Sequence, residues 1–164
     1  MTLSQPLYAS SSSPRVGPGV AAGVTEAQIH DQVHAFYGKI RTDPALGPIF
    51  KQAIGDWDHH LGKMCDFWSS VLLMTGRYKG APMAVHAALP VIRPTHFARW
   101  LHLFRQTADE VCPPEAAVLF VAKSEMIAQS LQFHLAATRD EPAWAAMSVA
   151  PRRSGAIGAR SRQK

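Results

Sequence analysis

The stretch "DWDHHLGKMCDFWSSVLL", residues 56–73, predicts an amphipathic helix that carries two adjacent histidines. Side chains three and four positions apart share one face of a helix. From His60 this rule leads to the apolar residues Met64 and Phe67, whereas from His59 it leads to charged and polar residues. His60 is therefore expected on the buried face and His59 on the face exposed to water.

The rest of the chain is typical of an all-α protein, because no stretch alternates apolar and polar residues as a strand does. A capping box at Thr25–Gln28 opens a helix that ends at Asp43, since Pro44 disfavours helical geometry in the residue before it. The stretch "PALGPIF", residues 44–50, is expected to form a turn-rich corner. Three further helices are expected, at about residues 82–90, 94–111 and from 114 onward.

Length and composition favour one folded domain with tails at both ends. Residues 1–24 are rich in Ser, Gly, Pro and Ala and are expected to form a disordered extension. The folded domain is expected over residues 25–138, followed by a flexible basic tail over residues 139–164. The net charge of +5 arises in this tail, where five basic residues beyond residue 150 face no acid. The folded part is thus neutral, and nucleic acid is not expected as a partner.

The sequence carries no signal for secretion or for a membrane. The N-terminus lacks a basic segment followed by an apolar run, and no apolar run approaches the ~20 residues that span a bilayer. Cys65 and Cys112 match no metal-binding or redox spacing, as is typical of a reducing compartment. A soluble, cytoplasmic protein is therefore expected.

Two inward histidines on different helices favour a metal held in an apolar setting. His60 shares its helix with apolar side chains, and His86 lies in an Ala-rich segment without polar neighbours. For each histidine alone, a core imidazole bonded to a backbone carbonyl is the competing interpretation. A zinc site would need three or four closely spaced ligands. The many aromatic residues suit a flat apolar cofactor instead, and these residues are Phe36, Phe50, Phe67, Trp68, Trp100 and Phe104.

The chain resembles the truncated (2-over-2) haemoglobins, and within them group III. The motifs that carry the resemblance are "FYGKIRTDPALGPIF" (36–50), "DWDHHLGKMCDFWSSVLL" (56–73), "YKGAPMAVHAALP" (78–90) and "HFARWLHLF" (96–104). The resemblance covers roughly residues 26–137 and implies a globin-like, 2-over-2 helical sandwich around haem. The glycine pairs of groups I and II are absent, as in group III.

The resemblance implies haem b (iron protoporphyrin IX) as the cofactor, with His86 as the proximal ligand to iron. It implies a polar distal side lined by Tyr37, His60 and Trp100. It further implies contacts to the porphyrin from Phe50 and Met64, and a contact to a propionate from Lys63.

The activity implied is binding of O₂ and other diatomic ligands (NO, CO) at a five-coordinate iron. Several distal donors would slow ligand release, which favours redox chemistry over O₂ transport. Whether the chain is an NO dioxygenase or has peroxidase-like activity stays open, as does the identity of a reductase partner. The alternative function is a haem-free, globin-like interaction or sensor module, which would not need His86.

Overall fold

The computed structural model describes residues 16–89 and 92–138, and every regular element in these ranges is a helix. The predicted all-α class is therefore confirmed. The helices are α1 (Pro18–Ala21), α2 (Glu26–Thr42), α3 (Gly47–Ala53), α4 (Trp57–Leu73), α5 (Pro82–Ala87), α6 (Pro94–Val111) and α7 (Pro114–Thr138). None of the described helices is both long and apolar enough to cross a membrane.

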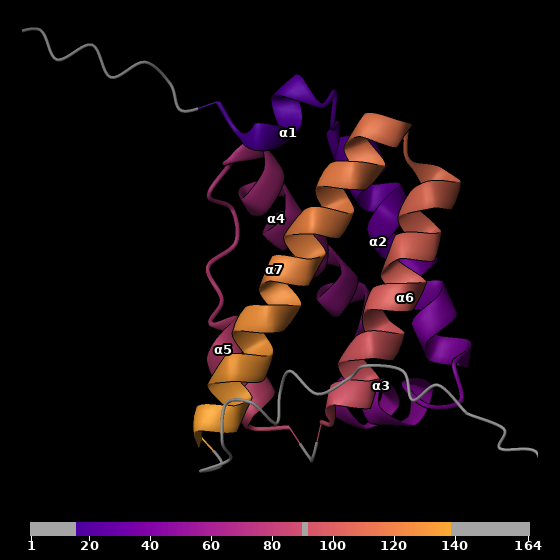
Figure 1. Ribbon diagram of the computed structural model, residues 1–164, viewed down its shortest axis with the longest axis vertical. Coiled ribbons are helices and arrows are strands. Elements are labelled where there is room, and N and C mark those ends of the chain that lie inside the picture. The colour runs from indigo at the N-terminus through magenta and orange to yellow at the C-terminus, as the bar shows by residue number, and fades with distance from the viewer. Residues whose placement is uncertain (1–15, 90–91, 139–164) are drawn as a thin grey trace, which may run out of the picture.

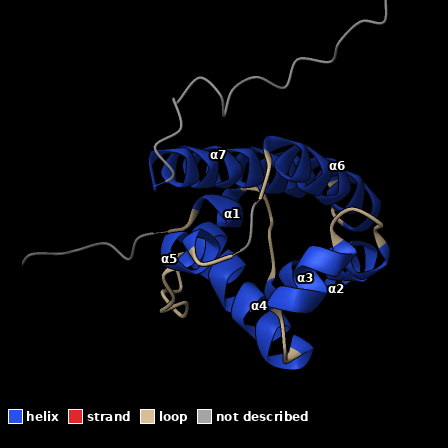
Figure 2. Ribbon diagram, turned by 90° about the horizontal axis from the view of Figure 1, so that it is seen from below, coloured by secondary structure: helices blue, strands red, loops and turns tan. Residues whose placement is uncertain are grey.

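Two pairs of helices form the two layers of the molecule (Figures 1 and 2). Helix α2 packs on α4, and α6 packs on α7, with α2 also packed on α6 to join the layers. The shorter helices attach at the edges, α3 to α2, α5 to α7 and α1 to α4. The helices that carry His60 and His86 are thus held by different partners, α4 by α2 and α5 by α7.

Aromatic rings fill the core between the layers. Phe104 on α6 stacks on Trp68 of α4 with ring centroids 5.0 Å apart and meets Phe36 of α2 edge to face at 5.0 Å. Phe120 on α7 lies 5.5 Å from Trp68. These four rings are buried, and aromatic pairs at such distances stabilise a core beyond the area that they bury. The cluster joins the second half of α4 to α6 and α7.

The ends of α2 are fixed as the sequence predicts. Thr25 and Gln28 form the reciprocal capping box, and the helix stops at Asp43. The Asp43 side chain is only 2% exposed, and Arg99 of α6 donates to its carboxylate from Nε and from a terminal nitrogen, each at 2.7 Å. The same carboxylate accepts from the amides of Ala45 and Leu46. Asp43 therefore ties the corner after α2 to the start of α6.

The loop between α4 and α5 is anchored by Arg77. Its guanidinium lies 2.6 Å from Glu26 of α2, 3.4 Å from Asp66 of α4 and 2.7 Å from the Ser69 hydroxyl. One residue later, the Tyr78 amide donates to Ser70. These contacts fix the segment that leads into α5.

Two segments differ from the sequence-based expectation. Residues 16–24 belong to the predicted disordered extension, yet they include α1, which packs on the end of α4. A Cβ atom at Gly17 would lie 2.4 Å from the Leu72 carbonyl oxygen, so the missing side chain is what lets the backbones approach. Residues 44–50 form more than a corner, because α3 begins at Gly47 with Pro48 in its first turn. Residues 1–15 and the basic tail over 139–164 lie outside the described residues, as does Pro90, at which the short helix with His86 was expected to end.

Candidate functional site

Helix α4 presents His60 inward and His59 outward. Asp56 caps the helix, its carboxylate accepting from the His59 amide at 3.0 Å, as expected of an N-cap residue. His59 is exposed, whereas His60 is half-buried. The predicted assignment of the two histidines to the two faces is confirmed.

Aromatic rings from three helices surround His60. The Tyr37 ring on α2 meets the His60 imidazole edge to face, with centroids 5.0 Å apart. Trp57 lies 6.1 Å from His60 and 6.2 Å from Tyr37, and Phe50 of α3 lies 6.0 Å from Tyr37. The fold thus brings together Tyr37, His60 and Phe50, three residues that the sequence places in one site.

The Nε2 atom of His60 is buried and has no hydrogen-bond partner among the described residues. A buried polar atom without a partner costs folding free energy and needs an explanation. Burial lowers the pKa of His60, the positive charge of Lys63 lowers it further, and so would a proton on His86 or His59. The imidazole is therefore neutral near pH 7, and no described residue bonds its Nε2 atom.

Tyr37 is a permanent donor beside this imidazole. The residue is buried, and its burial raises the pKa of the phenol, with a further contribution from Tyr78. A phenol with a raised pKa keeps its proton at any physiological pH. Tyr37 can therefore donate a hydrogen bond but cannot act as a base there.

His86 lies on α5 with one of its ring nitrogens already bonded. Its Nδ1 is 2.6 Å from the carbonyl oxygen of Pro82, at the start of the same helix. A carbonyl oxygen can only accept, so Nδ1 is the donor and Nε2 carries the free lone pair. Binding a metal through one nitrogen while the other donates to a backbone carbonyl is the usual arrangement of a ligating histidine. His86 is half-buried, as a ligand with an open side must be.

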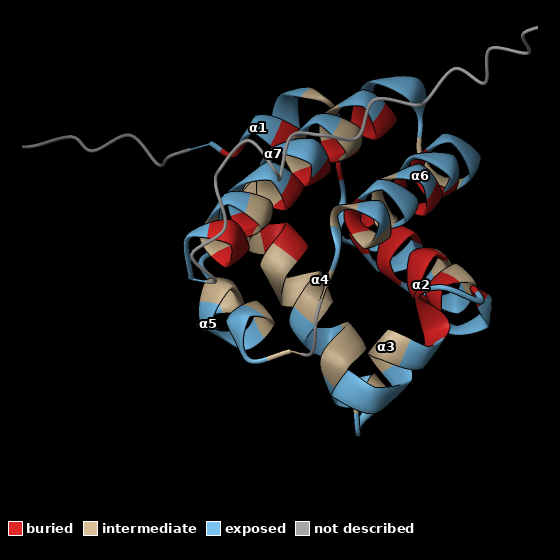
Figure 3. Ribbon diagram, turned by 60° about the horizontal axis from the view of Figure 1, so that its bottom comes forward, coloured by how far each residue is buried: buried red, intermediate tan, exposed pale blue. Residues whose placement is uncertain are grey.

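The inner face of α4 is apolar but incompletely covered by the protein. Leu61, Met64, Phe67 and Val71 pack against the core cluster, yet each is only half-buried. Figure 3 shows α4 largely in the intermediate colour, in contrast to the buried residues of α2. Apolar side-chain surface on this face of α4 is therefore still accessible.

The remaining predicted site residues differ in how closely they join the cluster. Met64 is half-buried on the same face as His60. Trp100 stacks on Phe104 at 5.2 Å and meets Phe36 at 5.2 Å, and Phe36 in turn meets Tyr37 at 5.1 Å. Lys63 is exposed and acts on the cluster through the effect of its charge on His60.

Two features of the site have no assigned role in the sequence-based prediction. Trp57 contacts both Tyr37 and His60, and the Arg41 guanidinium lies 4.8 Å from the centre of its ring. The sequence could have predicted that Trp57 lies on the inner face of α4, because it is three positions before His60. The Pro82 carbonyl has no such signal, since any backbone oxygen one turn before His86 would look alike in sequence.

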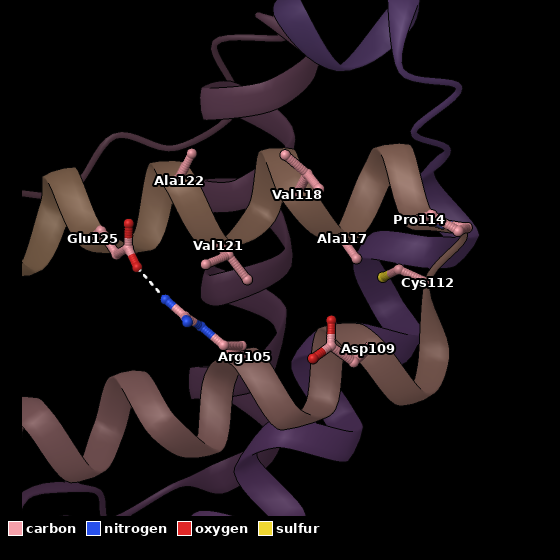
Figure 4. Close-up of a pocket in the computed structure, with 9 residues that line it drawn as sticks. All are labelled: Arg105, Asp109, Cys112, Pro114, Ala117, Val118, Val121, Ala122 and Glu125. Atoms are coloured by element: carbon pink, nitrogen blue, oxygen red, sulfur yellow. Dashed lines mark hydrogen bonds and ion pairs between the residues drawn. The ribbon is translucent and has the colours of Figure 1, made fainter.

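The described residues contain no other arrangement that suits a metal-centred cofactor. No group of three or more His, Cys, Asp or Glu side chains in the described ranges is arranged to hold a metal ion. A hollow of about 510 Å³ lies between α6 and α7, lined by side chains such as Cys112, Val118 and Val121 (Figure 4). Arg105 and Glu125 pair across it. It shares no residue with the cluster around His60 and His86.

Comparisons with known proteins agree with the fold and with the predicted family. No protein-family model matches the chain. The Group 3 truncated hemoglobin ctb of Campylobacter jejuni is 34% identical over 113 residues, which are 66% of this chain and 89% of that protein.

Solved structures give the same result. The crystal structure of a group III truncated hemoglobin from Campylobacter jejuni matches with a TM-score of 0.66 and 34% identity, covering 68% of this chain and 91% of that one. A Group II truncated hemoglobin from Bacillus anthracis matches with a TM-score of 0.57 and 26% identity, covering 74% and 91%. The chain therefore belongs to the truncated haemoglobin family, and within it to group III.

Proposed function

We propose that the chain binds haem b between α4 and α5, with Nε2 of His86 as the proximal ligand to iron. The observation that carries the proposal is the buried Nε2 of His60, which has no hydrogen-bond partner among the described residues. Two imidazoles that interact electrostatically from different helices, each with a free ring nitrogen, suit the two sides of one metal-centred cofactor.

The residues present fit such a group. Porphyrin is flat and largely apolar, so it would complete the burial of the half-buried residues on α4, Met64 among them. Phe50 and Met64 would contact the ring, and the exposed Lys63, one position before Met64 on α4, would reach a propionate. Iron in the bound cofactor would supply the diatomic-ligand binding and redox chemistry of the globins.

On the distal side, Tyr37, His60 and Trp100 would orient and hold a diatomic ligand such as O₂, NO or CO. Tyr37 keeps its proton, and the Trp100 indole is a donor only, so both would donate to a ligand atom that carries negative charge. A charge-assisted hydrogen bond contributes about 1.5–3 kcal/mol. Because about 1.4 kcal/mol corresponds to a factor of ten in rate, two such donors would slow ligand release by about 100-fold or more.

Slow release is a disadvantage in a transporter. We therefore propose redox chemistry on a held ligand, either NO detoxification with O₂ or turnover of peroxide, with electrons from a reductase. In peroxide turnover the neutral His60 imidazole would also accept and return a proton, whereas oxidation of NO to nitrate by O₂ takes up no proton. A reducing, cytoplasmic setting would suit the two free cysteines, Cys65 and Cys112.

Hemin titration tests the binding proposal, with the Soret absorbance as the readout. We expect saturation at one hemin per chain, and a CO complex after reduction. Met64→Glu should weaken hemin binding, because it places a carboxylate on the inner face of α4. The control is Met126→Glu on α7, where the methionine is 58% exposed. Absence of saturable binding, or an equal effect of the two variants, would refute the proposal and favour the haem-free module.

A further inference from the structure

A second pair of histidines lies on the exposed side of α2 and shares no residue with the site described above. His30 and His34 are four residues apart on one helix, and both are exposed. Their imidazole rings are stacked, with centroids 4.0 Å apart and planes inclined by 24°. Two histidines at this spacing on one helix face are an established way to hold a metal ion with two imidazoles.

The hydrogen bond of His30 leaves one of its ring nitrogens free to bind a metal ion. Its Nδ1 lies 3.3 Å from a carboxylate oxygen of Asp31. An ionised carboxylate can only accept, so Nδ1 is the donor and the lone pair is on Nε2. A carboxylate on one ring nitrogen fixes the tautomer and makes the other nitrogen a better metal ligand.

The charges around the pair also favour a cation. Burial lowers the pKa of His34, as would a proton on His30, while Asp31 and Asp58 act in the opposite direction. The lowered pKa keeps His34 neutral near pH 7, which is the form that binds a metal. Asp58 belongs to the first turn of α4, so carboxylates from two helices act on this imidazole.

We propose that His30 and His34 together bind one divalent transition-metal ion, such as Ni²⁺ or Zn²⁺, on the surface of α2. Two nitrogen ligands at 2.0–2.1 Å from a tetrahedral ion lie about 3.3 Å apart, which rotation of two rings with centroids 4.0 Å apart can reach. Water completes the coordination, since no third His, Cys, Asp or Glu of the described residues joins the pair. Asp31 and Asp58 accept hydrogen bonds from these waters or neutralise the ion.

This site stands on different residues from the haem proposal and does not depend on it. A two-ligand site on the surface contributes little to folding, in contrast to a closed structural zinc site. Metal binding here stabilises the folded chain, because the unfolded chain lacks the helix that sets the spacing. The helix that would bind the ion also carries Tyr37 on its buried face.

Isothermal titration calorimetry with NiCl₂ tests the proposal. Ni²⁺ is the probe because it suits imidazole ligands. We expect one saturable site in the wild-type chain, a rise of the unfolding temperature with Ni²⁺, and a loss of about 100-fold in affinity in His30→Ala and in His34→Ala, because the second ligand acts at high effective concentration. The affinity of the double variant for Ni²⁺ should be at most a few-fold lower than that of either single variant.

The matched control is His102→Ala, which removes an exposed histidine of α6 that has no histidine four residues away. It should bind Ni²⁺ as the wild-type chain does. The proposal is overturned if the wild-type chain shows no saturable site. It is also overturned if His59→Ala or His102→Ala weakens binding as much as His30→Ala, since dispersed single histidines would then account for the metal uptake.

Discussion

The Nδ1 atom of His86 lies 2.6 Å from the carbonyl oxygen of Pro82, four residues earlier in α5. This contact sets the tautomer of the imidazole and the direction of its free nitrogen. The partner is a neutral carbonyl and not a carboxylate, so the imidazole gains less basicity than it would beside an anion. Helix α5 has no buried residue of its own and is held through Met83, which packs against the cluster of Phe97, Leu131 and Leu135. The position of His86 thus depends on α7 and on the Arg77 anchor before α5.

Removing a distal donor should speed O₂ release from the hemin-loaded, reduced chain. For Tyr37→Phe and Trp100→Phe we expect dissociation rates at least about tenfold higher, because each variant keeps a ring but loses a donor worth about 1.5–3 kcal/mol. Stopped-flow displacement of O₂ by CO measures the rates. Phe133→Leu is the control, since that ring is 40% exposed on α7 and carries no hydrogen-bond donor. Rates within twofold of the wild type for Tyr37→Phe and Trp100→Phe would remove the argument for slow release.

Stability without added hemin should fall on acidification partly because of His60. Its folded pKa lies below the ordinary value of 6.5, since burial opposes the charged form. The unfolded chain takes up a proton near pH 6.5 and the folded chain only at lower pH. The stabilisation is therefore present above pH 6.5 and is lost as the pH falls below that value and through the folded pKa.

Urea unfolding at pH 7.5 and pH 5.5 measures this loss. His60→Gln should lose less stability between the two pH values than the wild-type chain, whereas His102→Gln should lose as much as the wild type. An unchanged loss in His60→Gln would show that the imidazole is not protected from protonation.

Asp43→Asn should destabilise the fold by about 2 kcal/mol, because the carboxylate receives charge-assisted hydrogen bonds from Arg99 and caps the corner after α2. The NH₂ group of an asparagine at this position would also face the hydrogen-bond donors of Arg99 or of the Ala45 and Leu46 amides. Glu110→Gln is the matched control, since its pair with Lys39 is exposed to water and its loss should destabilise the fold much less. Equal unfolding free energies for the two variants, measured by urea titration, would contradict the structural role given to Asp43.

The sequence predicts those parts of the fold that local rules determine. The capping box at Thr25, the stop before Pro44 and the N-cap at Asp56 follow from side-chain chemistry within one turn, and the structure confirms them. Helix α1 could not be predicted in this way, because its place depends on Gly17 and Gly19 fitting against the backbone of Leu72 at the end of α4. That contact is between residues far apart in the chain and leaves no periodic pattern.

The candidate site also has parts that local sequence rules predict and parts that they do not. Helix periodicity is enough to choose His60 over His59, and the structure agrees. The roles of Tyr37, Trp100 and His86 come from the family resemblance and stay predictions. Neither the Pro82 carbonyl nor the ring contact between His30 and His34 could be predicted, because both depend on side-chain rotation and not on position in a helix.

The most direct test of the account is the absorption spectrum of His86→Gly loaded with hemin and reduced, recorded with and without added imidazole. If the position 86 imidazole ligates iron, the variant should differ from the wild-type chain in its Soret band, and imidazole should restore the wild-type spectrum. A variant spectrum identical to that of the wild type, and unchanged by imidazole, would contradict the assignment of His86 as the proximal ligand.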